Sequence, residues 1–554
     1  MKNILIYLLL LTSISNFAQE EDAIVYFNSK PNSAAFFANP LSELSARSLT
    51  RRTNQNIALD ITDAPMSSTY IAQVDASIGI TVLAKSKWLN CVYIRGLISN
   101  ISSLSTLSFV QNIKFLDNSL NSRPSKNPED KFIFQKNVVK TSNARQNANA
   151  VFNYGNSFNQ INMLKGDYLH QQNFTGTGKI IAVCDSGFPG VNTAQPFQRL
   201  INNNQILGGY DFVNDDNDYF SGDSHGTLVL SCMGGFTDNQ LVGTAPDAKY
   251  YLYQTEDNES ETPYNENPVE EANWVEAAEE ADRVGADIIT TSLGYFGFEN
   301  EAYSHTYADM TGDKNFASKG LNIAFSKGII CVVSAGNAGG SSEPHCGAPA
   351  EANKALAIGS VRSDRIRSGF SSIGPSFDGR IKPDLMAQGS NSVLSYPDGT
   401  IGVNSGTSFS GPIMAGMIAS FWQAVPNLTN QQVIDLVRQS ADNFATPNNQ
   451  YGYGIPNFQT ALANANLSSS NFSNNYNNLF TIAPNPANNE IEILFPSNFS
   501  NAILNLNNIL GQNISTTKVT NNGSKISLSE LNSGVYFYKI ESENYIQTGK
   551  IIKN

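Results

Sequence analysis

The sequence predicts an α/β fold built on a doubly wound, mostly parallel sheet, with an α+β domain before it and an all-β sandwich after it. In the central part of the chain, short apolar runs end at small or polar residues, which is typical of strands buried in a parallel sheet. The N-terminal part mixes strand-like and helical stretches, whereas the C-terminal part alternates polar and apolar residues between turn residues. A chain of 554 residues is also too long for one compact domain.

The chain begins with the pattern of an export signal. Lys2 precedes an apolar run from Ile4 to Leu11, and the segment after that run provides a small residue for a cut after Ala18. The run is too short to span a bilayer, and no later run reaches the necessary length. We therefore predict that residues 1–18 are a signal peptide and that the mature protein is exported and soluble.

Residues 19–118 are predicted to form the α+β domain. Four runs in this part favour strands, namely AIVYF, ITVLA, WLNCVYI and FVQNIKFL, and SELSARSLTRRTNQ favours a helix. In that helix we expect Arg47, Arg51 and Arg52 to lie on a solvated face. Residues 119–150 are polar and rich in Asn, Lys and Ser, so they are predicted to be an accessible linker in which processing occurs.

The first chemical group of the central part is an aspartate at the end of a predicted strand. The run KIIAVCDSGFPG places an apolar strand over Ile180–Cys184, and Gly187 and Pro189 break it after Asp185. The carboxyl end of such a strand lies at the crevice where open α/β sheets bind ligands. There an aspartate can accept the Nδ1 proton of a histidine and stabilise the imidazolium. A single aspartate at this place is also a common turn former.

His225, one of four histidines, stands in the small-residue run SHGTLVLSCMGG. Gly226 leaves room at a helix start, and an apolar stripe follows at Val229, Leu230 and Met233. This pattern predicts a buried helix with the imidazole at its beginning. The alternative is a histidine that is buried in the core or that caps the helix.

Ser408 stands in the run SGTSFSGP, before the apolar stretch IMAGMIASFWQAV that predicts a helix. We expect Gly406 to adopt backbone angles closed to larger residues and Pro412 to occupy the first helical turn, so that free amides point back at Ser408. A serine hydroxyl is a weak nucleophile and needs both a base and oxyanion donors. The alternative is an ordinary small-residue turn before a buried helix.

In the order Asp185, His225 and Ser408, and with these flanking residues, the chain resembles the subtilisin-like (subtilase) serine peptidases. The resemblance covers roughly residues 154–466 and is carried by LHQQNFTGTGKIIAVCDSG, HGT, VGTAPDAKYY, KPDLMAQG, SGTSFSGP and YGYGIPNFQTAL. It implies a peptidase domain of the subtilisin-like fold over residues 151–467 that cleaves protein or peptide substrates. It also implies that Ser408 is the nucleophile, that His225 is the general base and then acid, and that Asp185 orients the histidine.

An oxyanion donor is expected as well, because acyl transfer places negative charge on the substrate carbonyl oxygen. The run IICVVSAGNAGG predicts a buried strand over Ile329–Ser334, followed by Asn337 in a glycine-rich turn. In subtilases the matching asparagine donates its side-chain amide to the oxyanion, so the resemblance gives this role to Asn337, beside the backbone N–H of Ser408. The alternative is that Asn337 only occupies a left-handed turn position.

The resemblance also places the substrate beside two strands. The run DIITTSLGYFG resembles the strand that pairs with an extended peptide, and SAG in the run IICVVSAGNAGG resembles the opposite wall of the primary pocket. Pairing through the main chain gives affinity without side-chain selectivity, so we expect broad endopeptidase activity. Leu293 can equally belong to an ordinary core strand. The expected substrate-binding residues are Ser292, Leu293, Gly294, Ser334, Ala335 and Gly336.

Residues 468–478 read as a second linker, and residues 479–554 are predicted to form the β-sandwich. The elements PNP, Gly511, LNSGVY and TGKIIK resemble the C-terminal sorting domain of the type IX secretion system of Bacteroidota. This implies passage across the inner and outer membranes, with outer-membrane secretion machinery as partner, and then release or attachment at the cell surface. The alternative is an accessory Ig-like binding module. By position and size, the N-terminal domain resembles subtilase propeptides, which implies a transient inhibitor of the cleft.

Composition narrows the remaining options. A formal net charge of −13 argues against nucleic acid as a partner. The five cysteines lack CxxC metal spacing, and we expect buried thiols, although an oxidising compartment would allow Cys331 and Cys346 to pair. We expect no metal site and no required cofactor. The acidic stretches DFVNDDNDYFSGD and EDNESETPYNENPVEE could supply structural Ca²⁺ ligands, but they lack EF-hand spacing and are expected to be solvated loops.

The sequence therefore predicts a secreted serine endopeptidase. The competing hypothesis is an exported binding or adhesion protein that carries an inactive subtilase scaffold.

Overall fold

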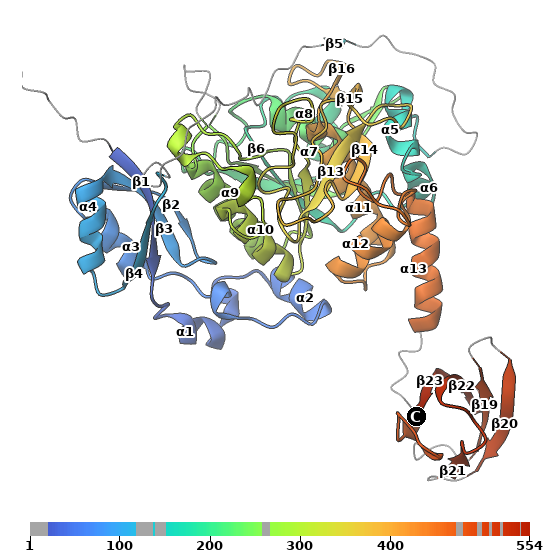
Figure 1. Ribbon diagram of the computed structural model, residues 1–554. Helices are drawn as coiled ribbons and strands as arrows, with labels where there is room; N and C mark the ends of the chain where they lie inside the picture. Colours follow the sequence, from blue (N-terminus) through green and yellow to red (C-terminus); the bar gives the residue numbers. More distant parts are fainter. Residues whose placement is uncertain are drawn as a thin grey trace, which may run out of the picture. The chain divides into compact units, whose positions relative to one another are not determined.

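The structure is a computed structural model, shown in Figure 1. It describes residues 20–117, 137–138, 151–257, 266–472, 480–495, 501–508, 512–520, 524–542 and 545–554. The predicted signal peptide and most of both predicted linkers lie outside these residues. Internal contacts divide the chain into two compact units, one ending at Leu462 and the other beginning at Ala463. Every helix in the described part is too short or too polar to cross a membrane.

The N-terminal part forms an antiparallel four-stranded sheet in the order β2-β3-β1-β4, and each predicted strand is confirmed. Inward side chains such as Val25, Val92 and Ile94 are fully buried in its core. The strands are β1 (Glu20–Phe27), β2 (Ile80–Ser86), β3 (Cys91–Leu97) and β4 (Val110–Phe115), and the helices are α1 (Ser33–Ala38), α2 (Ala46–Asn54), α3 (Ser68–Asp75) and α4 (Ile98–Ser103).

The central part is built on a seven-stranded parallel sheet in the order β14-β13-β12-β11-β6-β10-β7, which confirms the doubly wound α/β prediction. Every residue of β6 and β11 is buried, as their apolar runs predict. The strand order reverses at this pair, and a crevice forms at such a point. The strands are β6 (Ile180–Asp185), β7 (Ile206–Asp211), β10 (Lys249–Gln254), β11 (Ile288–Thr291), β12 (Ile330–Ser334), β13 (Leu356–Val361) and β14 (Leu385–Gln388).

Helices cover both faces of this sheet (Figure 1). Trp274 and Leu321, from α9 and α10, pack with Ala182 and Val333 on one face. On the other face α8 and α11 pack against each other and against the sheet. The helices are α5 (Phe158–Asn162), α6 (Gly166–Gln171), α7 (Gln198–Asn202), α8 (His225–Gly234), α9 (Val269–Val284), α10 (Phe316–Ser326), α11 (Thr407–Ala424) and α12 (Asn430–Gln439).

Two small sheets lie beside the main one. The hairpin of β15 (Ser392–Ser395) and β16 (Ile401–Asn404) pairs with β5 (Asn137–Val138), which belongs to the predicted first linker. The strands β8 (Phe236–Thr237) and β9 (Leu241–Val242) form the other.

The C-terminal unit contains two antiparallel sheets around a shared apolar core, which confirms the predicted β-sandwich. Helix α13 (Phe458–Phe472) contains the boundary between the two units and extends into the predicted second linker. One sheet has the order β17-β18-β21 and the other β20-β19-β22-β23. The strands are β17 (Thr481–Ala483), β18 (Glu490–Leu494), β19 (Ala502–Asn507), β20 (Asn513–Val519), β21 (Ser524–Ser527), β22 (Gly534–Ser542) and β23 (Tyr545–Lys553).

The five cysteines are all buried free thiols, so Cys331 and Cys346 do not form a disulfide here. Burial raises the pKa of the Cys346 thiol to about 12 and also raises that of Cys331. Both groups therefore stay protonated near neutral pH, as apolar core residues do.

A partly buried ion pair holds the segment after β11 against the start of α9. His305 Nε2 lies 2.6 Å from Glu271 Oε1, whose other oxygen accepts the N–H of Ala317 at 2.9 Å. Burial works against both charges, but the attraction of each partner outweighs it. As a result the pKa of His305 is raised above 6.5 and that of Glu271 is lowered below 4.5.

We expect His305→Gln to lower the free energy of unfolding by about 2 kcal/mol between pH 4.5 and 6.5, where both groups are charged in the native protein. The raised pKa of His305 means that its contribution is lost as the pH rises through that pKa. The lowered pKa of Glu271 means that its contribution is lost as the pH falls through that one. Urea unfolding of both proteins from pH 3 to pH 9 measures this window. A difference that stays constant over the whole range would contradict the assignment.

Candidate active site

Asp185 and His225 meet at the carboxyl edge of the sheet. Asp185 ends β6 and His225 begins α8, and the Oδ1 and Nδ1 atoms lie 2.6 Å apart with both side chains fully buried. A carboxylate only accepts hydrogen bonds, so Nδ1 carries the proton and Nε2 is the basic nitrogen. The backbone N–H of Ser186 also donates to Asp185 Oδ1 at 2.9 Å. Asp223 Oδ1 accepts the backbone N–H of His225 at 2.8 Å and so fixes the start of α8.

Two glycines allow the start of α8 to lie close to the chain that follows Asp185. A Cβ atom on Gly226 would lie 2.4 Å from the carbonyl oxygen of Gly187 and 2.7 Å from the ring of Phe188. A larger residue at this position would push α8 away from the chain that follows Asp185. Gly187 itself has φ of 140°, which other residues rarely adopt. The predicted room at the helix start is therefore confirmed.

Ser408 lies in the first turn of α11, which begins at Thr407 and so starts earlier than its apolar stretch suggests. The serine is 4% exposed, and the ring of Phe409, the next residue, lies 6.2 Å from that of His225 between ring centroids. The packing of α8 against α11 thus brings the Ser408 turn to the side of the Asp185 and His225 pair.

The expected reason for Gly406 is wrong. Its φ of 163° and ψ of 154° are extended backbone that any residue adopts, and the nearest atom to an added Cβ lies 3.6 Å away. Pro412 lies inside α11 and not in its first turn. The start of α11 is fixed instead by side chains, because Ser334 Oγ donates to the carbonyl oxygen of Thr407 at 2.7 Å.

Asn337 follows β12 and is bound to the residue before Ser408. Its Oδ1 accepts both the backbone N–H and the Oγ1 hydroxyl of Thr407, each at 2.9 Å. Two donors on the oxygen fix the orientation of the amide, so its NH₂ group points away from Thr407, and the residue is exposed. The left-handed alternative is wrong, because Gly336 has φ of 99° whereas Asn337 is not among the residues with positive φ.

Thr407 is a site residue that the sequence reasoning missed. Its hydroxyl accepts the N–H of Gly336 at 3.1 Å while it donates to Asn337. It therefore links the end of β12 to the start of α11. The threonine of the SGTS run was the available signal, since it adjoins the serine.

The six expected substrate residues fall into two groups. The buried group contains Ser292, Ser334 and Ala335. Ser292 Oγ donates to the carbonyl oxygen of Ser408 at 2.9 Å, and Ser334 Oγ donates to that of Thr407, so both serines support the Ser408 turn. Leu293 is 4% exposed and belongs to the apolar core, as its alternative interpretation stated. Gly294 is exposed and Gly336 is half-buried, so these glycines open the strand ends to solvent.

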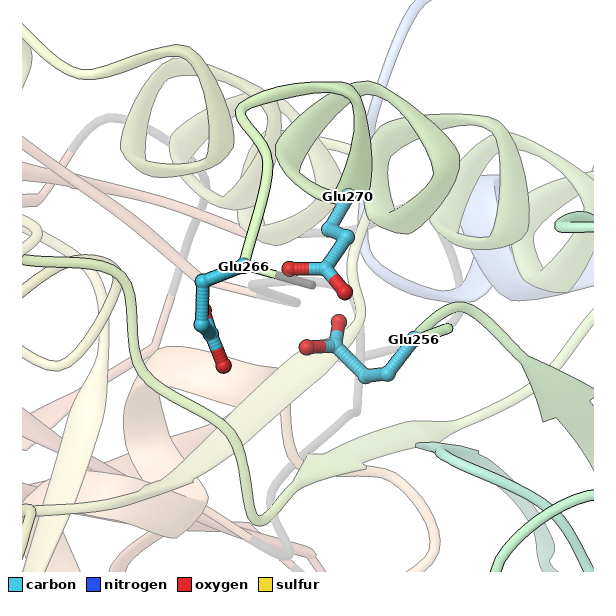
Figure 2. Close-up of side chains that lie close together, drawn as sticks. All are labelled: Glu256, Glu266 and Glu270. Carbon is cyan, nitrogen blue, oxygen red and sulfur yellow. The ribbon is translucent and has the colours of Figure 1, made fainter. Parts of the chain in front are cut away.

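Three glutamates of the second acidic stretch gather between the end of β10 and the start of α9, as Figure 2 shows. The carboxylate oxygens of Glu256, Glu266 and Glu270 lie within 4.8 Å of one another, close enough to hold a cation. Tyr295 donates to Glu256 at 2.6 Å, and the N–H of Asp257 donates to Glu270 at 3.2 Å. Since Glu256 and Glu270 are buried, the prediction of a fully solvated loop is wrong at these two positions.

Three family models match the chain. The Subtilase family matches residues 176–454, a Peptidase S8 propeptide domain of Bacteroidota matches residues 22–131, and a Secretion system C-terminal sorting domain matches residues 481–554. The matches follow the observed order of an α+β domain, a parallel α/β domain and a β-sandwich.

Characterised relatives match the central part. Subtilisin NAT from Bacillus subtilis subsp. natto is 30% identical over 305 residues, which cover 54% of this chain and 70% of that protein. Subtilisin from Bacillus pumilus is also 30% identical, over 54% of this chain and 97% of its own length. Serine protease AprX from Bacillus subtilis is 27% identical over 52% of this chain and 67% of that protein. A crystal structure of MycP1 with the N-terminal propeptide removed is 23% identical and covers 55% of this chain and 96% of its own, with a TM-score of 0.44.

The family model covers half of the chain, from before Asp185 to beyond Ser408. We conclude that the chain belongs to the subtilase family and is a subtilisin-like serine endopeptidase, with a Bacteroidota propeptide domain before the peptidase domain and a secretion sorting domain after it.

Proposed function

We propose that the protein hydrolyses peptide bonds through a triad of Asp185, His225 and Ser408 and an acyl-enzyme intermediate. The observation that carries the proposal is the 2.6 Å hydrogen bond that fixes the histidine tautomer in a buried site beside the Ser408 turn. Nε2 of His225 takes the proton from Ser408 Oγ as the oxygen attacks the substrate carbonyl. The imidazolium, stabilised by Asp185, then gives this proton to the leaving amine. Water then attacks the acyl-enzyme: His225 takes a proton from the water and returns it to Ser408 Oγ as the acyl group leaves.

Asn337 and the backbone N–H of Ser408 act as oxyanion donors in this proposal. The NH₂ group of Asn337 is turned away from Thr407 toward the exposed side, where a substrate carbonyl can reach it. Such a donor acts mainly on the transition state, because negative charge on the oxygen develops only there.

We therefore expect Asn337→Ala to lower kcat by about 10²–10³-fold with little change in KM. Steady-state hydrolysis of a peptide substrate by the processed protein measures both constants. An unchanged kcat would remove Asn337 from the mechanism, and a loss that falls mainly on KM would make it a substrate-binding residue instead.

The substrate lies in an extended conformation between residues 292–294 and 334–336 in this proposal. The exposed Gly294 and half-buried Gly336 leave room for a peptide main chain, and recognition through main-chain atoms supports broad specificity. Residues 1–18 direct the chain across the inner membrane, and the sorting domain directs it across the outer membrane to the surface or the medium. The propeptide blocks the cleft until the chain is cut within residues 119–150.

A fluorophosphonate probe tests the proposal. It forms a covalent bond with an activated serine, so peptide mapping of the processed protein should locate the label on Ser408. An exported binding protein with an inactive scaffold would remain unlabelled, and a label on another serine would assign the nucleophile elsewhere.

A further inference from the structure

The propeptide contacts the peptidase domain at two places, through its four-stranded sheet and, separately, through helix α2. At the first, the turn between β2 and β3 binds the side of α9: Ser86 Oγ and the backbone N–H of Trp88 donate to Glu279 at 2.7 and 2.9 Å. The N–H of Lys87 donates to the other oxygen of Glu279 at 3.0 Å. Trp88 is 4% exposed and belongs to the same apolar cluster as Trp274 of α9. This contact combines apolar burial with hydrogen bonds to one carboxylate.

The second place is helix α2, which lies apart from the four-stranded sheet (Figure 1). Two of its three arginines, Arg51 and Arg52, are buried, so the expectation that they are solvated is wrong, whereas Arg47 is exposed. Arg51 and Arg52 both bind the Asp282 carboxylate of α9, and the Arg52 contact measures 2.7 Å. Arg51 Nε also donates to the carbonyl oxygen of Lys327 at 3.1 Å, and its Nη1 donates to that of Ala286 at 2.5 Å.

The peptidase domain also contributes a cation to this contact, and propeptide carboxylates bind it. Lys327 follows α10, is 1% exposed, and its Nζ lies 3.0 Å from Asp60 Oδ2 and 3.2 Å from Asp63 Oδ1. The Thr62 hydroxyl accepts a further hydrogen bond from Nζ at 2.7 Å. Asp63 also binds Arg52 at 2.8 Å, so the cations and carboxylates form one continuous network.

The network is balanced on each side of the boundary. The propeptide contributes two arginines and two aspartates, and the peptidase domain contributes Asp282 and Lys327. Asp282 is fully buried, and both of its ion-pair partners come from α2. Removing one member of such a network leaves an uncompensated buried charge, which is much more costly than losing an exposed ion pair.

Neighbouring hydrogen bonds extend the same contact. Arg47 Nε donates to the carbonyl oxygen of Gly285 at 3.0 Å at the exposed rim. Gln55 donates to the carbonyl oxygen of Gly328 at 2.8 Å and accepts the N–H of Asn430 at 2.8 Å. The segment thus binds the ends of α9 and α10 and the start of α12.

We propose that residues 46–63, which we name the arginine clamp, form a second anchor that holds the propeptide on the peptidase domain after the linker has been cut. Asp282 and Lys327 are the receiving site for the clamp. Cutting the linker then changes covalent connectivity without releasing the inhibitor, and release requires the charge network to open. The clamp therefore sets the lifetime of the inhibited complex. This inference concerns binding and holds whether or not Ser408 is the nucleophile.

The test uses the full chain with Ser408→Ala and a recognition sequence for an added specific protease inserted between residues 119 and 136. After the cut, size-exclusion chromatography at timed intervals measures how fast the N-terminal fragment dissociates. We expect the parent fragment to stay bound and Arg51→Met to dissociate about 100-fold faster, because methionine retains the apolar stem without the charge. A parent fragment that separates at once, or an Arg51→Met fragment that stays as long as the parent fragment, would overturn the proposal.

Lys85→Met is the matched control. Lys85 is a cation on the first contact, 3.6 Å from Glu276, but its side chain is 58% exposed. An exposed pair contributes little, so this variant should dissociate at nearly the parent rate. An acceleration equal to that of Arg51→Met would show a general charge effect and refute a specific clamp.

A second measurement covers the case in which Arg51→Met does not fold. Asp282→Asn removes the receiving carboxylate, and amide hydrogen exchange on the uncut chain reports each segment separately. Residues 46–54 should lose protection by at least tenfold while β1 and β3 keep theirs. Full retention of protection in α2 would overturn the proposal. The double variant Arg51→Met with Asp282→Asn should lose less protection against exchange than the sum of the losses in the two single variants, because the two residues bind each other and their effects are coupled.

Discussion

Ser408→Ala is expected to lower kcat for peptide hydrolysis by about 10⁶-fold, the loss that removing the serine or histidine of a subtilisin triad causes. In the proposed mechanism no atom is then left to form the acyl-enzyme, and the hydrogen bond between Asp185 and His225 has no reaction to assist. The turn itself should persist, because Ser334 and Ser292 bind the backbone oxygens of Thr407 and Ser408. Residual activity is measured with a fluorogenic peptide after an added protease has cut the linker and the propeptide fragment has been separated from the peptidase domain.

Ser410→Ala is the matched control for this prediction. Ser410 is fully buried in the same turn, and its Oγ donates to the carbonyl oxygen of Thr407 at 3.0 Å. Loss of that hydrogen bond should cost about 1 kcal/mol of stability and change activity only a few-fold. If Ser410→Ala abolished hydrolysis while Ser408→Ala retained it, the nucleophile would have been misassigned.

The sequence predicted the parts of the fold that depend on local patterns. The runs that became β6 and β12 are apolar, short and bounded by glycine or polar residues, so their type and ends could be derived without a partner. The placement of Asp185 at a strand end and His225 at a helix start followed from the same patterns. The hydrogen bond between them needed the resemblance, because forty positions of sequence separate the two residues.

Features that depend on distant partners could not be predicted. A helix with several arginines is typically solvated. Arg51 and Arg52 are buried because they bind Asp282, which lies about 230 positions later in the sequence. In the same way the burial of Glu256 depends on Tyr295 from another element. Thr407 was overlooked because its two side-chain partners, Gly336 and Asn337, lie on a different strand end.

The helix that carries Ser408 shows a different kind of error. Its apolar stretch suggested a start near residue 413, but α11 begins at Thr407. Polar side chains from β12 and from the residue after β11 bind the first turn and extend the helix beyond its apolar pattern. Periodicity locates the buried face of a helix, whereas its first residue depends on the groups that satisfy its end.

Asp185→Ala is expected to lower kcat on the order of 10⁴-fold. The change removes both effects of the carboxylate, namely the choice of the Nδ1–H tautomer and the stabilisation of the imidazolium. Asp223→Ala is its control, because Asp223 binds the backbone N–H of His225 and not the ring. The kcat of that variant should stay within a few-fold of the parent value. A loss of kcat comparable to that of Asp185→Ala would mean that any disturbance at the start of α8 impairs catalysis.

Asp185→Asn separates the two effects. Asp185 Oδ1 accepts from both His225 Nδ1 and the N–H of Ser186, whereas Oδ2 has no hydrogen-bond partner among the described residues. An asparagine placed with its NH₂ at Oδ1 would face two donors, so its oxygen should keep that position and still accept the Nδ1 proton. The variant then loses the charge but keeps the tautomer, and its kcat should lie between those of the parent and Asp185→Ala. A kcat as low as that of Asp185→Ala would have two explanations: either the amide turns over, or the charge supplies the whole effect. The ¹⁵N shifts of the His225 ring distinguish the two explanations, because only a turned amide moves the ring proton to Nε2.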